Sequence, residues 1–568
     1  MASQSPPARP PVSPLVDREQ ALDRAATTAL DVVVIGGGIT GVGIALDAAS
    51  RGHSVALVER DDLASGTSSK SSKLVHGGLR YLEQREFGLV YEAVRERNLL
   101  RRLAPHLVRP LAFAIPTDDT ARRAAVKVGL SMYDGMAAGR NVRNHQRLDP
   151  AALLEALPDV ARGRGRGGYR YYDCQTDDAR LTLAVAQAAH AFGALVVTHA
   201  EVVDFLRLKG AVVGCTVRDR LGGAVFDLTA RWVVNATGVW VDRVRALTPE
   251  ERAPLLTPSK GVHLTFHGRD LRVRDGAFIP SGADDGRLVF VIPWGQQVIV
   301  GTTDERYEGD LEEPSVTASE AGYLLNAINE SFDTRLTLSQ VIAAWAGLRP
   351  LLRAPGATTA PTDLSRRHAI FEEPKGLITI TGGKLTTYRR MAEELVDRIM
   401  GAEGAKARCV THRLPIGVRG SVEDALSDLH EVSRSVGLDP QLAGSLLHRH
   451  GSDAAAVVTF CAEHGEAERL LPELPYLKGE VRWAARRELA RTLDDVLQRR
   501  LRVSLRDPQA GGGAVAWAAK ALAEELGWSQ AERDRQVDSY LEKVGRERGA
   551  IALDTAWRWV GARDAGPG

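Results

Sequence analysis

Near the N-terminus, two short apolar runs flank a glycine-rich turn. A helical lead-in at residues 18–26 precedes the β-branched run 31–35, which has the character of a buried parallel strand. Residues 36–43 interrupt the pattern, residues 44–50 predict a helix, and residues 54–58 predict a second strand. Strand, glycine turn, helix and strand within about 30 residues form one βαβ unit.

Further along the chain the pattern is mixed and then becomes helical. A helix is predicted at 181–192, and strands are predicted at 195–198, 202–206, 211–218, 224–230, 232–235 and 377–381. Short alternating strands between residues 262 and 300 indicate a mostly antiparallel sheet. Beyond about residue 409, long amphipathic stretches predict a C-terminal helical domain.

Composition narrows the class of protein. With 568 residues, 44% hydrophobic and 26% charged, the chain is expected to be globular and to have several domains. The net charge of +1 provides no global attraction to nucleic acid. The four cysteines form no C-x-x-C pair, so neither a zinc site nor a dithiol centre is predicted, and no metal ligands are assigned. No run of about 18 apolar residues predicts a membrane span, which leaves peripheral attachment open.

The glycine turn has the spacing of a dinucleotide site. Gly36 makes the tight turn, Gly38 lets the backbone approach a pyrophosphate, and Gly41 allows the helix to pack on the strand. Glu59, at the end of the second strand, is placed to accept hydrogen bonds from ribose hydroxyls and would repel a 2′-phosphate. FAD or NAD is therefore favoured over NADP.

Three downstream segments favour FAD. The hydroxyl-rich loop 65–73 is suited to wrap a second phosphate or the flavin, and residues 235–238 end a strand in small side chains. Residues 382–386 end another strand and open a helix, whose N-terminus attracts negative charge. Glycine-marked strand ends this far apart in sequence indicate one long cofactor crossing one sheet.

These motifs resemble the FAD-dependent, membrane-associated glycerol-3-phosphate dehydrogenases of the aerobic bacterial type. The segments that carry the resemblance are 31–52, 67–83, 233–242, 260–266, 300–304, 347–351, 381–389 and 492–500. The run Ser-Ser-Lys-Leu-Val-His-Gly-Gly-Leu-Arg-Tyr is long and distinctive, and Gly-Gly-Lys-Leu-Thr-Thr-Tyr-Arg supports it.

The resemblance implies a fold and a division into domains. The fold is an α/β FAD-binding Rossmann-like domain of the glutathione-reductase and D-amino-acid-oxidase type, with an antiparallel-sheet substrate domain and a C-terminal α-helical domain. The expected boundaries are a tail at 1–29, an FAD domain at 30–110, 171–245 and 340–405, a substrate domain at 111–170 and 246–339, and a helical domain at 406–568.

The implied reaction is oxidation of sn-glycerol 3-phosphate at C2 to dihydroxyacetone phosphate, with electrons passing through FAD to a membrane quinone. The implied location is the cytoplasm, peripherally on the inner face of the cell membrane. A homodimer is one assembly to consider, and the oligomeric state stays open. The alternatives are an oxygen-reducing glycerol-3-phosphate oxidase, an amine or amino-acid oxidase of the same fold, and a flavin-binding sensor without turnover.

Two histidines compete for the role of base. His76 lies in a glycine-rich segment beside the expected flavin loop, and imidazole titrates near neutrality. A lone histidine is more often structural, and it is the resemblance that raises His76 above its rival, His263.

Cations are expected to hold the substrate's phosphate. Arg349 follows an apolar stretch and is followed by a proline, which suits a rigid, inward-facing position. Lys384 lies at a strand end marked by glycines. Further candidates are Arg80, Tyr81 and Arg366. The alternative is that the arginines among these residues are ordinary surface residues, as most arginines are. The residues expected to contact the cofactor are Gly36, Gly38, Ile39, Thr40, Gly41, Glu59, Arg60, Thr67, Ser68, Ser69, Ser72, Lys73, Leu74, Val203, Ala236, Thr237, Gly238, Gly383, Lys384, Leu385 and Thr386.

A basic run between residues 478 and 506 has two interpretations. One is an amphipathic surface on anionic lipid. The other, which is favoured, is a solvated helix face whose arginines pair with Glu480, Glu488, Asp494 and Asp495.

Overall fold

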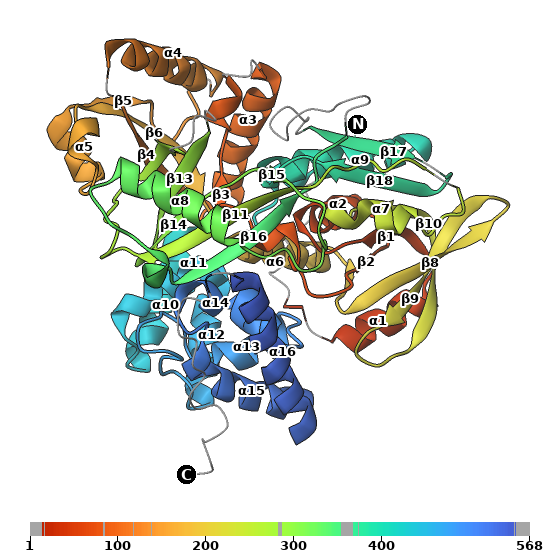
Figure 1. Cartoon of the computed structure of the whole chain (residues 1–568). Helices are drawn as coiled ribbons and strands as arrows, with labels where there is room; N and C mark the ends of the chain where they lie inside the picture. The colour runs from red at the N-terminus through yellow and green to blue at the C-terminus, as the bar shows by residue number, and fades with distance from the viewer. Residues whose placement is uncertain are drawn as a thin grey trace.

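A mostly parallel sheet forms the first layer of the chain, with only β17 antiparallel among the strands of its main order. The structure is a computed structural model that describes residues 14–15, 17–82, 86–117, 119–137, 139–250, 252–281, 287–353, 367–372, 374–549 and 551. The strand order of this sheet is β17-β18-β10-β1-β2-β7, with β8 and β9 continuing from β10 as an antiparallel extension (Figure 1). The bounds are β1 Leu30–Ile35, β2 Val55–Val58, β7 Leu195–Val197, β8 Ala200–Leu208, β9 Ala211–Asp219, β10 Val225–Asn235, β17 His368–Glu372 and β18 Leu377–Gly382.

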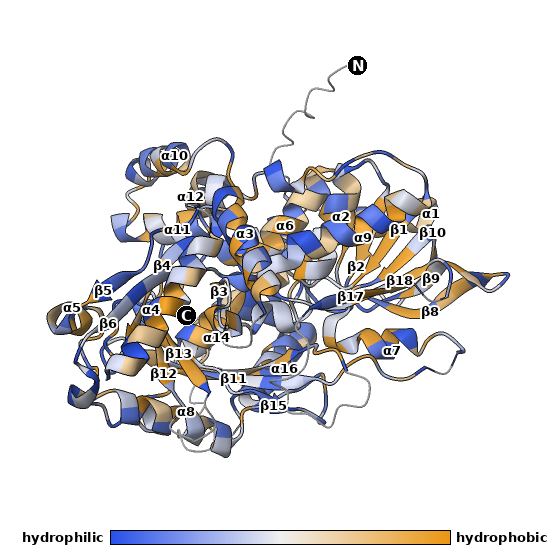
Figure 2. Cartoon of the chain, turned by 90° about the horizontal axis from the view of Figure 1, so that it is seen from above, coloured by the Kyte–Doolittle hydropathy of each residue, from blue (hydrophilic) through white to orange (hydrophobic). Residues whose placement is uncertain are grey.

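Strand β1 explains why this sheet is covered on both faces. Val32 and Val34 pack in one core with helices α2 (Ile39–Ser50), α6 (Asp178–Ala191) and α9 (Tyr388–Ala402). Val33 and Ile35 point the other way, into a core shared with α1 (Arg18–Thr27) and with β8 and β9. A strand buried on both faces has no polar side, and Figure 2 shows β1 and β2 as hydrophobic along their length.

The second sheet is mostly antiparallel, in the order β15-β11-β14-β13-β12-β4-β6-β3, with β16 on β11 and β5 on β6. The bounds are β3 Leu74–Val75, β4 Arg109–Pro116, β5 Gln146–Leu148, β6 Gly168–Gln175, β11 Ser259–His267, β12 Gly276–Pro280, β13 Leu288–Trp294, β14 Gln297–Gly301, β15 Glu305–Arg306 and β16 Ala343–Arg349. Helix α8 (Ala318–Ser331) packs on β11 and β12, and α5 (Pro150–Ala156) packs beside β4.

Three helices connect or follow the sheets. Helix α3 (Phe87–Leu103) packs on α4 (Thr120–Met136) at one end of the molecule, and α7 (Val241–Arg245) follows β10 (Figure 1). No described helix is both long and apolar enough to cross a membrane.

The C-terminal part is helical, as predicted, and packs on both sheets. Its elements are α10 Val422–Ser435, α11 Ala443–His450, α12 Ala454–Glu463, α13 Glu480–Arg487, a π-helical turn Asp495–Arg500, α14 Val503–Arg506, α15 Gly512–Leu526 and α16 Gln530–Arg548. Two apolar cores stabilise this part, one around α13, α15 and α16 and one around α10 to α12.

Sheet membership differs from the expected segments at β3 and the first residues of β4, which lie in an expected FAD segment but belong to the second sheet, and at two longer strands. β6 begins at Gly168 and β16 spans Ala343–Arg349, and both belong to the second sheet, although residues 171–175 and 343–349 fall in expected FAD segments. The reason is pairing at long range, since β16 pairs with β11 and β6 pairs with β4. The domain boundaries therefore stay a proposal, with these strands moved to the substrate sheet.

Candidate active site

The glycine turn after β1 brings backbone from two strands into close contact. Gly36 has φ 109°, and a Cβ there would lie 2.8 Å from the carbonyl oxygen of Ala236 at the end of β10. A Cβ at Gly41 would collide with the carbonyl oxygen of Gly36. Gly38 caps α2 without a side chain, so the first N–H groups of that helix face the turn. Only glycines give this close packing and this open helix end.

Glu59 is fixed beside the turn. Its carboxylate accepts hydrogen bonds from the N–H of Gly37 at 2.6 Å and from the N–H of Asp61 at 2.8 Å. Burial raises the pKa of Glu59, and the negative charge of Asp61 adds to the rise, while these two hydrogen bonds oppose it. The side chain is therefore oriented where the sequence places a ribose.

A cleft of about 370 Å³ runs along the carboxyl ends of β1, β2, β10 and β18. It brings together most of the residues predicted to bind the cofactor. Those that line it are Gly36, Gly38, Ile39, Thr40, Glu59, Arg60, Thr67, Ser68, Val203, Ala236, Thr237, Gly238, Gly383, Lys384 and Leu385.

The other predicted cofactor residues lie behind this lining. Gly41 is part of the packed turn, and Ser69, Leu74 and Thr386 are buried. The Thr386 hydroxyl accepts a hydrogen bond from the His76 N–H at 3.2 Å, so it supports the neighbouring segment.

The sequence interpretation missed part of the lining. Trp240, Arg243, Leu247 and Met391 also face the cleft, and the guanidinium of Arg60 lies 5.3 Å from the centre of the Trp240 ring. Trp240 could have been found from the sequence, because it lies two residues after the predicted strand end at 235–238.

The cleft fits an extended flavin dinucleotide. It offers a glycine turn and an open helix N-terminus for a pyrophosphate, a carboxylate for a ribose, and further small residues at the ends of β10 and β18. Ser68 reinforces the turn, because its hydroxyl accepts the Ile39 N–H at 2.9 Å. Strand ends at residues 35, 236 and 382 thus line one cleft, and that a single ligand spans them stays a prediction.

His263 lies in the second sheet, on β11, and is 3% exposed. Its Nε2 is 2.8 Å from the Ser72 hydroxyl, and its ring stacks on Trp345 with centroids 4.9 Å apart. Burial, followed by the positive charges of Arg349 and Lys73, holds the pKa of His263 well below its usual range. The imidazole is therefore neutral at pH 7 and able to accept a proton.

His76, Tyr81 and Lys384 form a second group at the end of β18. Lys384 places its ammonium 3.5 Å from the centre of the Tyr81 ring, in cation–π contact. His76 is half-buried and meets Phe290 edge-on, with centroids 6.1 Å apart. Phe290 pairs with Gly301, which in turn pairs with His263, so the Phe290 ring that His76 meets and the His263 ring lie on the same face of the second sheet.

Arg349 ends β16 next to the cleft, since the following residue, Pro350, lines it. Its guanidinium donates to Asp304 at 3.0 Å, to the Thr302 hydroxyl at 3.0 Å and to the Thr303 carbonyl oxygen at 3.1 Å. The side chain is 24% exposed. Arg349 is thus a fixed cation at the edge of the site. The side chain of Arg80 and all of Arg366 lie outside the described residues.

A buried ion cluster supports the loop before His76. Lys73 was predicted to contact the cofactor, but its ammonium is fully buried and donates to Asp178 at 3.1 Å and to the Ser69 carbonyl oxygen at 3.0 Å. Burial lowers the pKa of Lys73 to about 8. Arg502, from the helical part, pairs with Asp178 as well. Lys73 and Ser72 therefore support the site from behind the cleft.

The basic run at 478–506 is only partly a solvated face: Arg486 is 46% exposed, but four of its arginines are buried. Arg482, Arg499, Arg500 and Arg502 are at most 9% exposed. Arg499 and Arg500 both donate to Asp62 at 2.7 Å, three residues after Glu59. Two of the expected partners, Asp494 and Asp495, do pair with Arg499. Glu488 lies 3.7 Å from Arg500. Glu480 pairs instead with Arg449, outside the run, at 2.9 Å. Packing against the FAD-binding sheet, which the local pattern does not reveal, buries part of this run.

Comparison with known proteins agrees with this geometry. Residues 31–398 match the family described as FAD dependent oxidoreductase, and residues 409–533 match the C-terminal domain of alpha-glycerophosphate oxidase. A glycerol-3-phosphate dehydrogenase of Mycobacterium leprae is 41% identical over 93% of this chain and 90% of its own. A probable mitochondrial glycerol-3-phosphate dehydrogenase of Caenorhabditis elegans is 37% identical over 93% of this chain and 74% of its own.

One solved structure covers nearly the whole chain. The glycerol-3-phosphate dehydrogenase of Bacillus halodurans, complexed with FAD, is 31% identical, covers 93% of this chain and 97% of its own, and superposes with a TM-score of 0.79.

Proposed function

Because the chain belongs to the FAD-dependent glycerol-3-phosphate dehydrogenases, we propose that it oxidises sn-glycerol 3-phosphate at C2 and passes the electrons to a membrane quinone. The observation that supports the reaction is that Lys384 lines the flavin cleft, while Arg349, which lies close to His263, directly precedes Pro350 in that lining. Bound FAD supplies a hydride acceptor, and the protein supplies orientation and proton transfer.

Proton removal falls to a histidine. As the C2 hydride leaves, the hydroxyl proton must move to a base within hydrogen-bond reach, so that the product is a ketone. We take His263 as the first candidate because its imidazole is neutral and lies beside Arg349, the proposed phosphate cation. Burial, and then the charge of Arg349, lowers its pKa and makes it a weak base before substrate binds. A phosphate dianion at Arg349 would offset that positive charge and raise the basicity of His263 as substrate binds. His76 remains the alternative.

Arg349 and Lys384 are proposed to hold the phosphate. A guanidinium fork and an ammonium together match a phosphate dianion. Asp304 fixes the fork at 3.0 Å, which leaves Arg349 little freedom to reorient when substrate enters. Tyr81 fixes Lys384 by its ring. Both cations are therefore preorganised.

An apolar helix face supports membrane contact. Ala121, Ala124, Ala125, Val128 and Met132 are spaced along α4 and exposed, with Val128 60% and Met132 40% exposed. On neighbouring α3, Phe87 is 42% and Tyr91 is 54% exposed. A helix that turns such a face to solvent is typical of interfacial attachment. The cytoplasmic membrane surface is the proposed location.

The acceptor is tested by comparing oxygen with quinone. Wild-type protein with glycerol 3-phosphate is given decylubiquinone in vesicles, a soluble dye, or oxygen alone. We expect quinone to be reduced at least tenfold faster than hydrogen peroxide appears. Faster oxygen reduction would support the oxidase alternative, to which the match with the alpha-glycerophosphate oxidase C-terminal domain points.

Variants of α4 separate membrane contact from chemistry. Val128→Glu with Met132→Glu is expected to lower the rate with vesicle quinone and to leave the rate with soluble dye unchanged. Val225→Glu, on the far β10 strand and 59% exposed, is the matched control. Equal rates for both variants with vesicle quinone would remove α4 from the proposal.

A further inference from the structure

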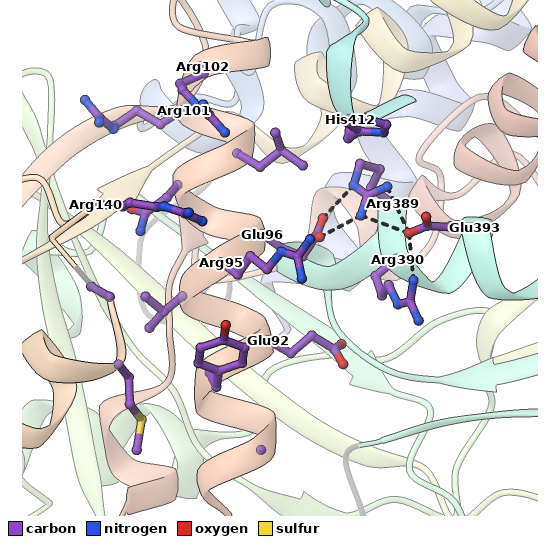
Figure 3. A pocket seen from close by; sticks show the side chains of 17 residues that line it. Glu92, Arg95, Glu96, Arg101, Arg102, Arg140, Arg389, Arg390, Glu393 and His412 are labelled. Atoms are coloured by element: carbon purple, nitrogen blue, oxygen red, sulfur yellow. Dashed lines mark hydrogen bonds and ion pairs between the residues drawn. The ribbon is translucent and has the colours of Figure 1, made fainter. Parts of the chain in front are cut away.

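A second cavity, of about 750 Å³, lies between α3, the end of α4 and the first turns of α9 (Figure 3). It is roughly twice the size of the cofactor cleft and shares no lining residue with it. Its charged lining consists of Arg95, Arg101, Arg102, Arg140, Arg389, Arg390, Glu92, Glu96 and Glu393, with His412 at the rim. Six arginines against three glutamates give a net charge of +3 with His412 neutral.

The carboxylates of this cavity are already engaged on the α9 wall. Arg389 is 5% exposed and donates to both oxygens of Glu96, at 2.8 and 2.7 Å. Glu393 accepts from Arg390 at 2.9 Å and from Arg389 at 3.2 Å, as the dashed lines in Figure 3 mark. Burial raises the pKa of the remaining carboxyl, Glu92, and so weakens its competition for a cation.

Four arginines on the other side lack such partners. Arg95, Arg101, Arg102 and Arg140 form no ion pair with a carboxylate in the part of the chain that the structure describes. The Arg101 Nε is shielded from solvent and has no hydrogen-bond partner there. Unneutralised guanidinium groups around one hollow repel each other, and a bound anion would relieve that repulsion.

We propose that this cavity binds the phosphate group of an anionic ligand, supplied either by an anionic lipid headgroup or by a free phosphate compound. Guanidinium groups bind phosphate by paired N–H donors, and several around one cavity strengthen that binding. The geometry suits a lipid headgroup as the source, because Tyr91 lines the cavity and also belongs to the exposed apolar residues of α3.

The site differs from the substrate site in position and in residues. None of its arginines lines the cofactor cleft. Helix α9 nevertheless begins directly after residues 385–387, of which Leu385 lines that cleft. A ligand that joins α3 to α9 through Arg389 and Arg390 would therefore stabilise the segment carrying Lys384.

The test uses two triple variants of the FAD-loaded protein. The cavity variant carries Arg95→Gln, Arg102→Gln and Arg140→Gln, three exposed positions whose change should leave folding intact. The control carries Arg24→Gln, Arg162→Gln and Arg335→Gln, which make the same charge change at exposed positions outside both cavities. The wild-type protein is measured beside the two variants. Phosphate bound at the substrate site is common to all three proteins and cancels in the comparison.

Two arms distinguish the sources. In the first, binding of inorganic pyrophosphate is measured by calorimetry. In the second, the protein is floated with vesicles of phosphatidylcholine, with or without phosphatidylglycerol. Each basic residue near an anionic surface raises the binding constant by a factor of about five. Removing three such charges should therefore lower the binding constant by on the order of a hundredfold.

A loss confined to the cavity variant with pyrophosphate identifies a free phosphate ligand, and a loss with phosphatidylglycerol vesicles alone identifies a lipid headgroup. A loss in both arms identifies a phosphate site that either source fills. The proposal is overturned if the cavity variant matches the control in both arms.

Discussion

His263 and Arg349 lie on paired strands, and each changes what the other does. Burial, and then the charge of the guanidinium, lowers the pKa of the imidazole and keeps it neutral, and a bound substrate phosphate would offset the effect of the guanidinium. Neither residue stands out in the sequence among 14 histidines and 73 basic residues. Arg349 was proposed from its place between an apolar stretch and a proline and His263 only as the rival of His76, and the structure adds their contacts with Ser72, Trp345 and Asp304.

The first prediction separates the two candidate bases. His263→Asn should slow flavin reduction at saturating substrate by roughly 10² to 10⁴, the usual contribution of a general base. His76→Asn should slow it less than about tenfold, and both proteins should keep FAD. Stopped-flow absorbance measures the rates. The reverse order would transfer the role to His76.

The second prediction concerns the phosphate. Arg349→Met should lower kcat/KM for glycerol 3-phosphate by about 10² to 10³, because a dianion then faces one cation in a partly dry pocket. With unphosphorylated glycerol the change should be small, since no phosphate is lost. Arg274→Met, at a 70% exposed arginine, is the control. An equal loss on both substrates would mean that Arg349 shapes the fold instead.

Among the elements, the βαβ unit was the easiest to predict. Its glycines and Glu59 lie within 24 residues and depend on local backbone geometry. The ion pairs joining Lys73 to Asp178 and Asp62 to Arg500 span more than 100 and 400 residues, so no local pattern contains them. For the same reason the basic run was expected on the surface, and β16 was assigned to the wrong sheet.

The third prediction tests the link between the π-helical turn Asp495–Arg500 and the cofactor loop. Asp62→Asn leaves two buried arginines facing one amide, which should cost about 3–5 kcal/mol and lower the temperature at which flavin is released. Asp534→Asn breaks an exposed pair with Arg533, where the two side chains are 61% and 37% exposed, and should cost about 0–1 kcal/mol. Equal release temperatures would show that Asp62 is not a structural link.

Across the whole molecule, two neutral histidines lie where the helical part packs on α3. His448 on α11 is half-buried and donates from Nδ1 to the carbonyl oxygen of His106, whose own side chain is buried. Burial lowers the pKa of each to about 3. Both must gain a proton when the chain unfolds below pH 6.5, so acid favours the unfolded state.

The fourth prediction follows from that sign. Folded pKa values near 3 lie below the unfolded value of about 6.5, so stability is full above pH 6.5 and is lost as pH falls toward 3. Each histidine should contribute a slope of about 1.4 kcal/mol per pH unit in that window. When the free energy of unfolding is measured in urea at several pH values, His448→Gln should lower its slope against pH by the equivalent of one proton. His430→Gln, at an exposed position, should leave that slope unchanged. An unchanged slope in His448→Gln would contradict the assignment.

The most direct test of the central claim is reduction of the bound flavin by substrate in the absence of oxygen. The purified holoenzyme is mixed anaerobically with sn-glycerol 3-phosphate, and its visible flavin absorbance is followed. The account predicts that this substrate bleaches the flavin in one turnover and yields one equivalent of dihydroxyacetone phosphate, whereas glycine and proline leave it oxidised. A flavin that stays oxidised with glycerol 3-phosphate but is bleached by an amino acid would contradict it.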